Sequence, residues 1–306
     1  MMRRSPRRGH AGTELLRLAQ RLTDRDRYIL SLVEQHRVLT TPQITQACFD
    51  HQHTAAQRLR VLAGLGLLAR FRPRLDRGSA PWHYVLDSYG AMVLAVERGQ
   101  DADQHRVRRD RQLALASSSQ LGHRLGAAGF FTALIAHARR SEGTAELVDS
   151  HNEAALDDWV SSLGCRSMVR PDGGGHWREH GRATVFVLEW DTGTEPHRRL
   201  QSKLERYAAF YAELRSLIAG GWNETVPWVL FSFPGHQREL QARKALSAYP
   251  GARDVPVATT CLVGDQNPAE RVWSVLRDGV AFRRRLGELA TPGQEAPDAE
   301  GERPRR

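Results

Sequence analysis

Three acidic residues stand close together between positions 172 and 191 and could bind a metal ion. Asp172 precedes three consecutive glycines, and Glu189 and Asp191 lie two positions apart after an apolar run over residues 185–188. Side chains alternate along a β-strand, so Glu189 and Asp191 should share one face, and a hairpin would place Asp172 beside them. Converging carboxylates repel one another unless a cation neutralises them, and their oxygens suit Mg²⁺ or Mn²⁺. We therefore predict that Asp172, Glu189 and Asp191 hold a divalent metal and take part in catalysis.

A lysine is the fourth predicted catalytic residue. The chain has two lysines among its 44 basic residues, Lys203 and Lys244. Lys203 falls on a helix predicted over residues 196–218, one turn before Tyr207, so both side chains can face the acidic residues. A lysine ammonium is a compact charge that can orient a water molecule or stabilise an oxyanion.

A purely structural role for the same residues stays open. In that interpretation Asp172 is a turn residue, and Glu189 and Asp191 are ordinary acidic residues at the end of a strand that pair with Arg198 or Arg199. The two histidines of the glycine-rich segment, His176 and His180, are expected to be exposed to solvent.

The elements that must position these residues alternate between helices and strands. The predicted order is a helix over 117–140, strands over 145–150, 168–170 and 184–190 with a glycine-rich hairpin between the last two, a helix over 196–218, a strand over 227–233, a helix over 237–248 and a strand over 255–263. This order predicts an α/β (mixed α+β) core around a mixed sheet.

The positive charge of the chain is concentrated at its beginning. Residues 1–80 carry 15 arginines, no lysine and six acidic residues, which accounts for the whole formal net charge of +9. Arginine pairs with phosphate through two hydrogen bonds, and such pairing releases counterions from a polyanion. The pattern favours double-stranded DNA as partner, and the alternative is a charge bias that only keeps the protein in solution.

The same region has the order of a winged helix-turn-helix domain. Helices are predicted to start at Thr23, at Thr41-Pro42 and near Thr54, followed by a strand, a basic turn and an aromatic strand over 82–86. The third helix would enter the major groove and the basic turn, or wing, would reach the backbone or minor groove. The predicted DNA-binding residues are, on the helix, Gln57, Arg58 and Arg60 and, on the wing, Arg72, Arg74 and Arg77. A small packing module with solvent-facing arginines is the alternative.

These patterns divide the chain into five segments. They are a basic flexible arm over 1–20, the winged-helix domain over 21–98, a linker over 99–116, the α/β domain over 117–285 and a disordered tail over 286–306. No apolar run approaches the roughly 20 residues of a membrane helix. The three cysteines form no CxxC pair, which argues against a disulfide framework and a zinc ribbon and favours the cytoplasm.

The second domain resembles the PD-(D/E)xK nuclease superfamily, also called restriction-endonuclease-like. That core runs αβββαβ, and its acidic residues hold a divalent metal. Pro171-Asp172 and Glu189 match the motif, whereas Asp191 stands where the motif has its lysine. The resemblance implies that Lys203 supplies the relocated lysine.

Over about residues 20–285 the chain also resembles the replication-relaxation proteins of actinobacterial plasmids and mobile elements. The resemblance rests on residues 22–26, 38–41, 65–68, 82–86, 129–134, 170–173 and, most specifically, 188–195. It implies a role in plasmid replication and DNA relaxation, with replication or plasmid-transfer proteins as further partners.

Two functions fit these observations. The first is a metal-dependent DNA endonuclease or nickase that the basic domain docks on DNA. The second is a catalytically inert replication or transcription-regulatory factor, which binds DNA and uses its nuclease-like domain for protein contacts.

Overall fold

The structure is a computed structural model of the 306-residue chain. It describes residues 18–74, 77–166, 169–220, 225–264 and 266–289, so residues 1–17 of the predicted arm and 290–306 of the predicted tail lie outside it. The described residues form two compact units that divide between Ala128 and Gly129. Among them, no helix combines the length and the hydrophobicity that crossing a bilayer requires.

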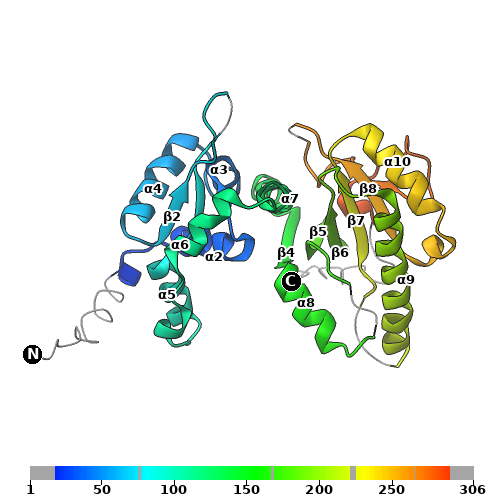
Figure 1. Ribbon diagram of the computed structural model, residues 1–306, viewed down its shortest axis with the longest axis horizontal. Helices are drawn as coiled ribbons and strands as arrows, with labels where there is room; N and C mark the ends of the chain where they lie inside the picture. The colour runs from blue at the N-terminus through cyan, green and yellow to red at the C-terminus, as the bar shows by residue number, and fades with distance from the viewer. Residues whose placement is uncertain (1–17, 75–76, 167–168, 221–224, 265, 290–306) are drawn as a thin grey trace, which may run out of the picture. The chain divides into compact units, whose positions relative to one another are not determined.

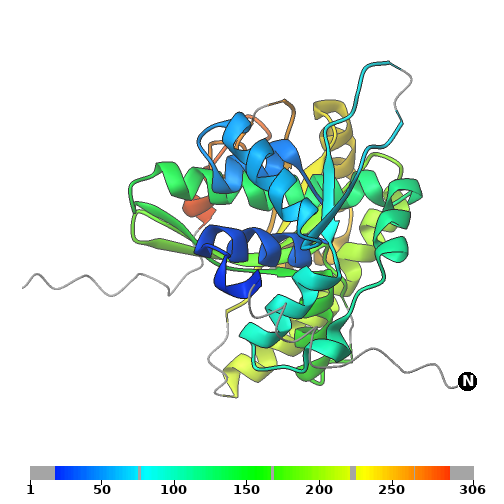
Figure 2. The same cartoon turned by 90° about the vertical axis from the view of Figure 1, so that its left-hand side faces the viewer.

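The first part of the first unit consists of three helices and a small antiparallel sheet (Figure 1). The helices are α2 (Asp24–His36), α3 (Thr41–Cys48) and α4 (Gln52–Gly64), and the strands, in the sheet order β1-β3-β2, are β1 (Leu39–Thr40), β3 (His83–Leu86) and β2 (Leu68–Phe71). Reciprocal hydrogen bonds between Thr23 and Asp26 cap α2, and the same arrangement of Thr40 and Gln43 caps α3. The cap of the second helix is therefore Thr40, one residue before the predicted Thr41. Figure 2 shows the β2–β3 hairpin extending beyond the helices of its unit.

The segment predicted as a charged linker carries regular structure. After α5 (Ser88–Glu97) come η1 (Ala102–His105), α6 (Arg109–Leu113) and η2 (Ala114–Ser117). Leu113, Leu115 and Ala116 pack with the beginning of α7 (Leu121–Arg140) against the small sheet, on a buried cluster that includes Phe71. The burial of these apolar side chains holds the segment on the first unit. A count of its charged residues does not reveal this burial.

The second unit is built on a six-stranded mixed sheet. Its strands, in the sheet order β4-β5-β6-β7-β8-β9, are β4 (Ala145–Asn152), β5 (Gly173–Glu179), β6 (Arg182–Trp190), β7 (Trp228–Phe233), β8 (Val257–Cys261) and β9 (Ser274–Val275). β4, β5 and β6 are antiparallel, β6, β7 and β8 are parallel, and β9 runs antiparallel to β8. The predicted mixed α/β architecture is confirmed, and β9 is an addition too short for a sequence pattern.

Helices cover both faces of this sheet. On one face, α8 (Glu153–Ser162), α9 (His197–Ala219) and α10 (His236–Ser247) share a single hydrophobic core with Val187 and Phe231. Phe186 points to the opposite face, where the ring of Phe130 on α7 lies 5.7 Å away between centroids. Two further 3-10 helices are η3 (Pro250–Asp254) and η4 (Leu286–Leu289), and the leucines of η4, placed in the tail by the sequence, are buried.

The glycine-rich segment is itself a strand, so the predicted hairpin position is wrong. β5 begins at Gly173, while Val169 and Arg170, predicted as strand, have no regular structure. A Cβ on Gly173 would lie 2.7 Å from the Phe131 ring, and one on Gly175 would lie 2.7 Å from the backbone oxygen of Asp149. Glycine occurs here because β4 and α7 approach β5 too closely for any side chain.

One row of residues crosses the three parallel strands of the sheet. Glu189 of β6 lies opposite Phe231 of β7, which lies opposite Thr259 of β8. Residues in register on adjacent strands direct their side chains to the same face, here the face covered by α9 and α10.

Candidate active site

The predicted catalytic residues gather where β6 ends. Glu189 is the second-to-last residue of β6, and Asp172 immediately precedes β5, whose beginning lies beside the end of β6. α9 starts after a short turn and returns along the sheet. This strand–turn–helix connection brings Lys203 of α9 back to Glu189 of β6.

Glu189 is enclosed by donors from α9. Its side chain is buried, with the residue 3% exposed. Lys203 Nζ donates to Glu189 Oε2 at 2.8 Å, and the Tyr207 hydroxyl donates to Oε1 at 2.6 Å. Lys203 also lies 3.2 Å from Oε2 of Glu195. Lys203 and Tyr207 are four residues apart on one helix face, so the expected meeting of both side chains with Glu189 is present.

Asp172 is tied to the end of the same strand. Its backbone N–H donates to the Leu188 oxygen at 2.9 Å, and its Oδ2 accepts the backbone N–H of Trp190 at 2.7 Å. These two backbone bonds hold the Asp172 carboxylate next to Glu189. Asp172 is half-buried, so the cluster reaches solvent on this side.

The two central groups have shifted pKa values. Burial raises the pKa of Glu189 to about 7, the charge of Asp172 adds to this effect, and Lys203 and Tyr207 oppose it. Burial disfavours the ammonium of Lys203, but the carboxylates of Glu189, Glu195 and Asp172 outweigh burial and hold its pKa above the usual value. Groups with strongly shifted pKa values at one place are typical of functional sites.

Asp191 is paired elsewhere. Its carboxylate is buried and accepts hydrogen bonds from Arg238 of α10, at 2.6 Å to Nη2, and from the backbone N–H of Gly193. The partner is therefore Arg238, 47 residues away, and not the nearby Arg198 or Arg199. Asp191 lies at the same end of β6 as Glu189, but it belongs to a separate ion pair.

The carboxylates of Asp172, Glu189 and Asp191 are not close enough together to bind one metal ion as they stand. Within the described ranges, the group of three ligating side chains whose atoms all lie within 4.8 Å of one another is His236, Glu239 and Cys261. Asp172 and Glu189 still fit a cation that prefers oxygen ligands, because an ionised carboxylate has about four lone-pair sites and Glu189 uses one on each oxygen. Asp191 does not fit in its present pairing.

The basic residues of the first unit differ in their surroundings. Gln57 and Arg60 of α4 are exposed, as are Arg72, Arg74 and Arg77 between β2 and β3. The guanidinium groups of Arg70 and Arg72 stack on Trp82, with their carbons 4.2 and 4.3 Å from the ring centroid.

Arg58 makes an internal ion pair. Its Nε donates to Asp26 Oδ1 at 2.7 Å and its Nη2 donates to Oδ2, while Asp26 is 1% exposed and also caps α2. Burial alone would raise the pKa of Asp26, but the hydrogen bonds from Arg58 and Thr23 lower it below the usual value.

Arg58→Ala is therefore expected to act on stability. It leaves Asp26 buried without its cation, and because Arg58 is partly exposed we expect a loss of about 1–3 kcal/mol in the free energy of unfolding. Urea denaturation measures this loss, and Arg60→Ala, on the exposed face of the same helix, should stay within about 0.5 kcal/mol of the unchanged protein. Equal stability of the two variants contradicts the structural role.

Comparison with known protein families decides the membership of the chain. The family model described as Replication-relaxation matches residues 30–221. The chain belongs to the replication-relaxation family. No curated protein and no solved structure matches it. The replication-relaxation match includes Asp172, Glu189, Asp191 and Lys203 and ends before Arg238.

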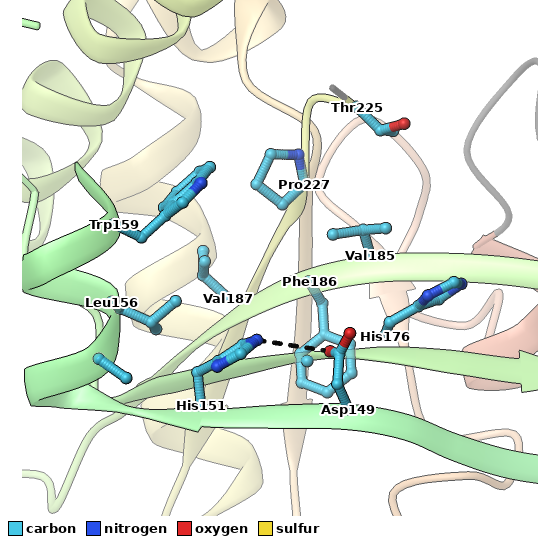
Figure 3. Close-up of a pocket in the computed structure, with 12 residues that line it drawn as sticks. Asp149, His151, Leu156, Trp159, His176, Val185, Phe186, Val187, Thr225 and Pro227 are labelled. Carbon is cyan, nitrogen blue, oxygen red and sulfur yellow. Dashed lines mark ion pairs between the residues drawn. The ribbon is translucent and has the colours of Figure 1, made fainter. Parts of the chain in front are cut away.

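This replication-relaxation protein also has a pocket of about 400 Å³ that the sequence did not indicate (Figure 3). Asp149 and His151 enter it from β4, His176 from β5 and Trp159 from α8. The expectation of an exposed His176 is wrong, because its Nε2 is buried and has no hydrogen-bond partner among the described residues. Interpreting the glycine run as a strand would have placed His176 on the pocket face.

Proposed function

We propose that this member of the replication-relaxation family binds duplex DNA and nicks or cleaves it with the help of Mg²⁺ or Mn²⁺, in plasmid or mobile-element replication. The first unit would be the winged-helix DNA-binding domain. The exposed face of α4 with Gln57 and Arg60, and the exposed arginines between β2 and β3, support this assignment. Arg58 would contribute by holding α4 against α2.

The second unit would be the nuclease-like domain. The order α7, β4, β5, β6, α9, β7 follows the αβββαβ order, with α8 inserted after β4. The observation that carries the proposal is the contact of Lys203 with Glu189, beside Asp172, at the end of the central strand β6. It unites two carboxylates with the relocated lysine in a partly enclosed site.

Each residue of the site would have a distinct role. Asp172 and Glu189 would hold the cation, which when bound acidifies a water molecule and neutralises charge on the phosphate. Lys203, steadied by Glu195, would orient the nucleophile or stabilise negative charge on the phosphate oxygens. Tyr207 would keep the Glu189 carboxylate in one orientation through its short hydrogen bond.

Supercoiled plasmid tests the proposal directly. Purified full-length protein with Mg²⁺ or Mn²⁺ should convert it to open-circular or linear DNA, and a chelator should stop the conversion. Unchanged plasmid in the presence of protein that still binds DNA contradicts the enzymatic function.

One observation favours the inert alternative. Asp191 is neutralised by Arg238, and both oxygens of Glu189 already accept hydrogen bonds from Lys203 and Tyr207. In that case the second unit would serve protein contacts, and the chain would be a DNA-binding replication or transcription-regulatory factor.

The dependence of nicking on pH is set by the raised pKa of Glu189. A cation competes with the proton, so a carboxyl with a pKa of about 7 binds metal poorly at pH 6 and well at pH 8. We expect the Mn²⁺ concentration for half-maximal nicking to fall about tenfold between these values. Tyr207→Phe, which removes a donor to the ionised carboxylate, should move the transition to higher pH. A metal requirement that does not change with pH contradicts this role of Glu189.

DNA binding by the wing has its own test. Arg74→Ala with Arg77→Ala should weaken binding to any duplex and reduce the slope of log K against log salt by about 2. Fluorescence anisotropy over a salt series measures both quantities. Arg106→Ala with Arg108→Ala removes two exposed arginines that pair with Asp103 and Asp110 and should leave the slope unchanged. Equal slopes in both double variants contradict the placement of the DNA on the wing.

A further inference from the structure

A second group of metal-ligating side chains lies outside the candidate active site, where α10 packs against β8. His236 and Glu239 are the first and fourth residues of α10, and Cys261 is the last residue of β8. One ligand atom of each lies within 4.8 Å of the other two. Residues three apart share one side of a helix, so the two α10 side chains face the strand end together.

The spacing of these atoms suits a small tetrahedral ion. Zinc binds nitrogen, oxygen and sulfur at about 2.0–2.3 Å, which places neighbouring ligand atoms about 3.3–3.8 Å apart. His236 Nδ1 and Glu239 Oε2 are 3.8 Å apart. The Cys261 sulfur lies within 4.8 Å of a ligand atom of each of the other two residues, so it would have to move closer to complete a zinc site.

The surroundings of Glu239 fix its carboxylate in an ionised, oriented state. The side chain is fully buried, and Arg283 donates to Oε1 at 2.8 Å and to Oε2 at 2.7 Å. The Thr259 hydroxyl donates to Oε1 at 2.7 Å. Arg283 and Thr259 therefore use both lone-pair sites of Oε1, while Oε2 keeps one besides that used by Arg283. Partners of this kind orient metal ligands in known metal sites.

The Cys261 thiol lies beside the Glu239 carboxylate, with a ligand atom of each within 4.8 Å of the other. A metal ion would take the place of the thiol proton, which leaves to solvent when the sulfur coordinates. The thiolate, the carboxylate and the guanidinium together carry one negative charge, so a divalent cation leaves a net charge of only +1.

We propose that His236, Glu239 and Cys261 bind one Zn²⁺ ion that joins the beginning of α10 to the end of β8. A thiolate with an imidazole selects zinc over magnesium, so the site differs in chemistry from the one assigned to Asp172 and Glu189. The side chain of His236 is 61% exposed, which gives an ion a path from solvent and lets water complete the tetrahedron. The proposal does not depend on nuclease activity.

Cobalt is the probe, because Co²⁺ occupies tetrahedral zinc sites and gives a charge-transfer absorption in the near ultraviolet when a thiolate binds it. Full-length protein without an affinity tag, kept reduced by a phosphine, should show this band with one equivalent of Co²⁺, and Zn²⁺ should abolish it. Cys261→Ser should remove the band, and His236→Ala should weaken Co²⁺ binding at least about tenfold. Cys165→Ser, which removes another partly exposed thiol, should keep the band and the affinity.

Three results overturn the proposal. They are the absence of a thiolate band in the unchanged protein, a band that persists in Cys261→Ser, and unchanged affinity in His236→Ala. Both substituted side chains are partly exposed, and circular dichroism of each variant confirms that it is folded. Loss of nicking without loss of Co²⁺ binding would affect only the proposed function.

Discussion

Glu189→Gln and Lys203→Met are each expected to reduce metal-dependent nicking by about 100-fold or more, because in the proposed function each removes a group that would act on the metal or the phosphate. The fold should tolerate both changes. Without Lys203 the pKa of Glu189 rises further, so that carboxyl binds a proton and stays buried as a neutral acid. Initial rates of open-circle formation, at equal concentrations of folded protein, measure the effect.

The chain supplies a matched control for the lysine. Lys244 is the other lysine, and it is exposed on α10. Lys244→Met makes the same change of charge and volume and should leave nicking at the level of the unchanged protein. Equal losses in both lysine variants would indicate a general electrostatic effect and would contradict the proposed catalytic role of Lys203.

Asp191→Ala is expected to lower the free energy of unfolding by about 3 kcal/mol. The substitution leaves Arg238 partly buried without its partner, which is the costly way to break an enclosed ion pair. Chemical denaturation of Asp191→Ala, Arg238→Ala and the double variant gives the coupling, for which we expect about 1–3 kcal/mol. The folded fraction of Asp191→Ala should still nick plasmid.

A metal-binding Asp191 would give the opposite pattern. Nicking would then disappear in Asp191→Ala and persist in Arg238→Ala. The two variants would have the same free energy of unfolding. That result would restore Asp191 to the set of three metal ligands predicted from the sequence.

Local patterns predicted much of this site. The alternation at the end of β6 placed Glu189 on the sheet face, and the four-residue spacing on α9 brought Lys203 and Tyr207 to it. Both inferences use only the period of one element and the turn that connects two of them. The mixed α/β architecture was predicted from the same periods.

Ion pairs between residues far apart in the sequence could not be predicted from these local patterns. Arg238 lies 47 residues from Asp191, and Arg58 lies 32 residues from Asp26. Nothing in the sequence around either arginine distinguishes it from an arginine exposed to solvent. β5 was missed because glycine disfavours strands in isolation, and the close approach of α7, β4 and β6 explains the three glycines. Tertiary packing decided each of these cases.

The row formed by Glu189, Phe231 and Thr259 limits how two ions could cooperate. Strands are about 4.8 Å apart, so the backbone positions of Glu189 and Thr259, two strands apart, are separated by about 10 Å. Hydrolases that use paired ions keep them about 3.5–4 Å apart, bridging one phosphate. An ion held at Glu239, the hydrogen-bond partner of Thr259, would therefore lie too far from Glu189 to share a substrate oxygen with an ion there. Any cleavage at Glu189 would then proceed with the ions of that site alone.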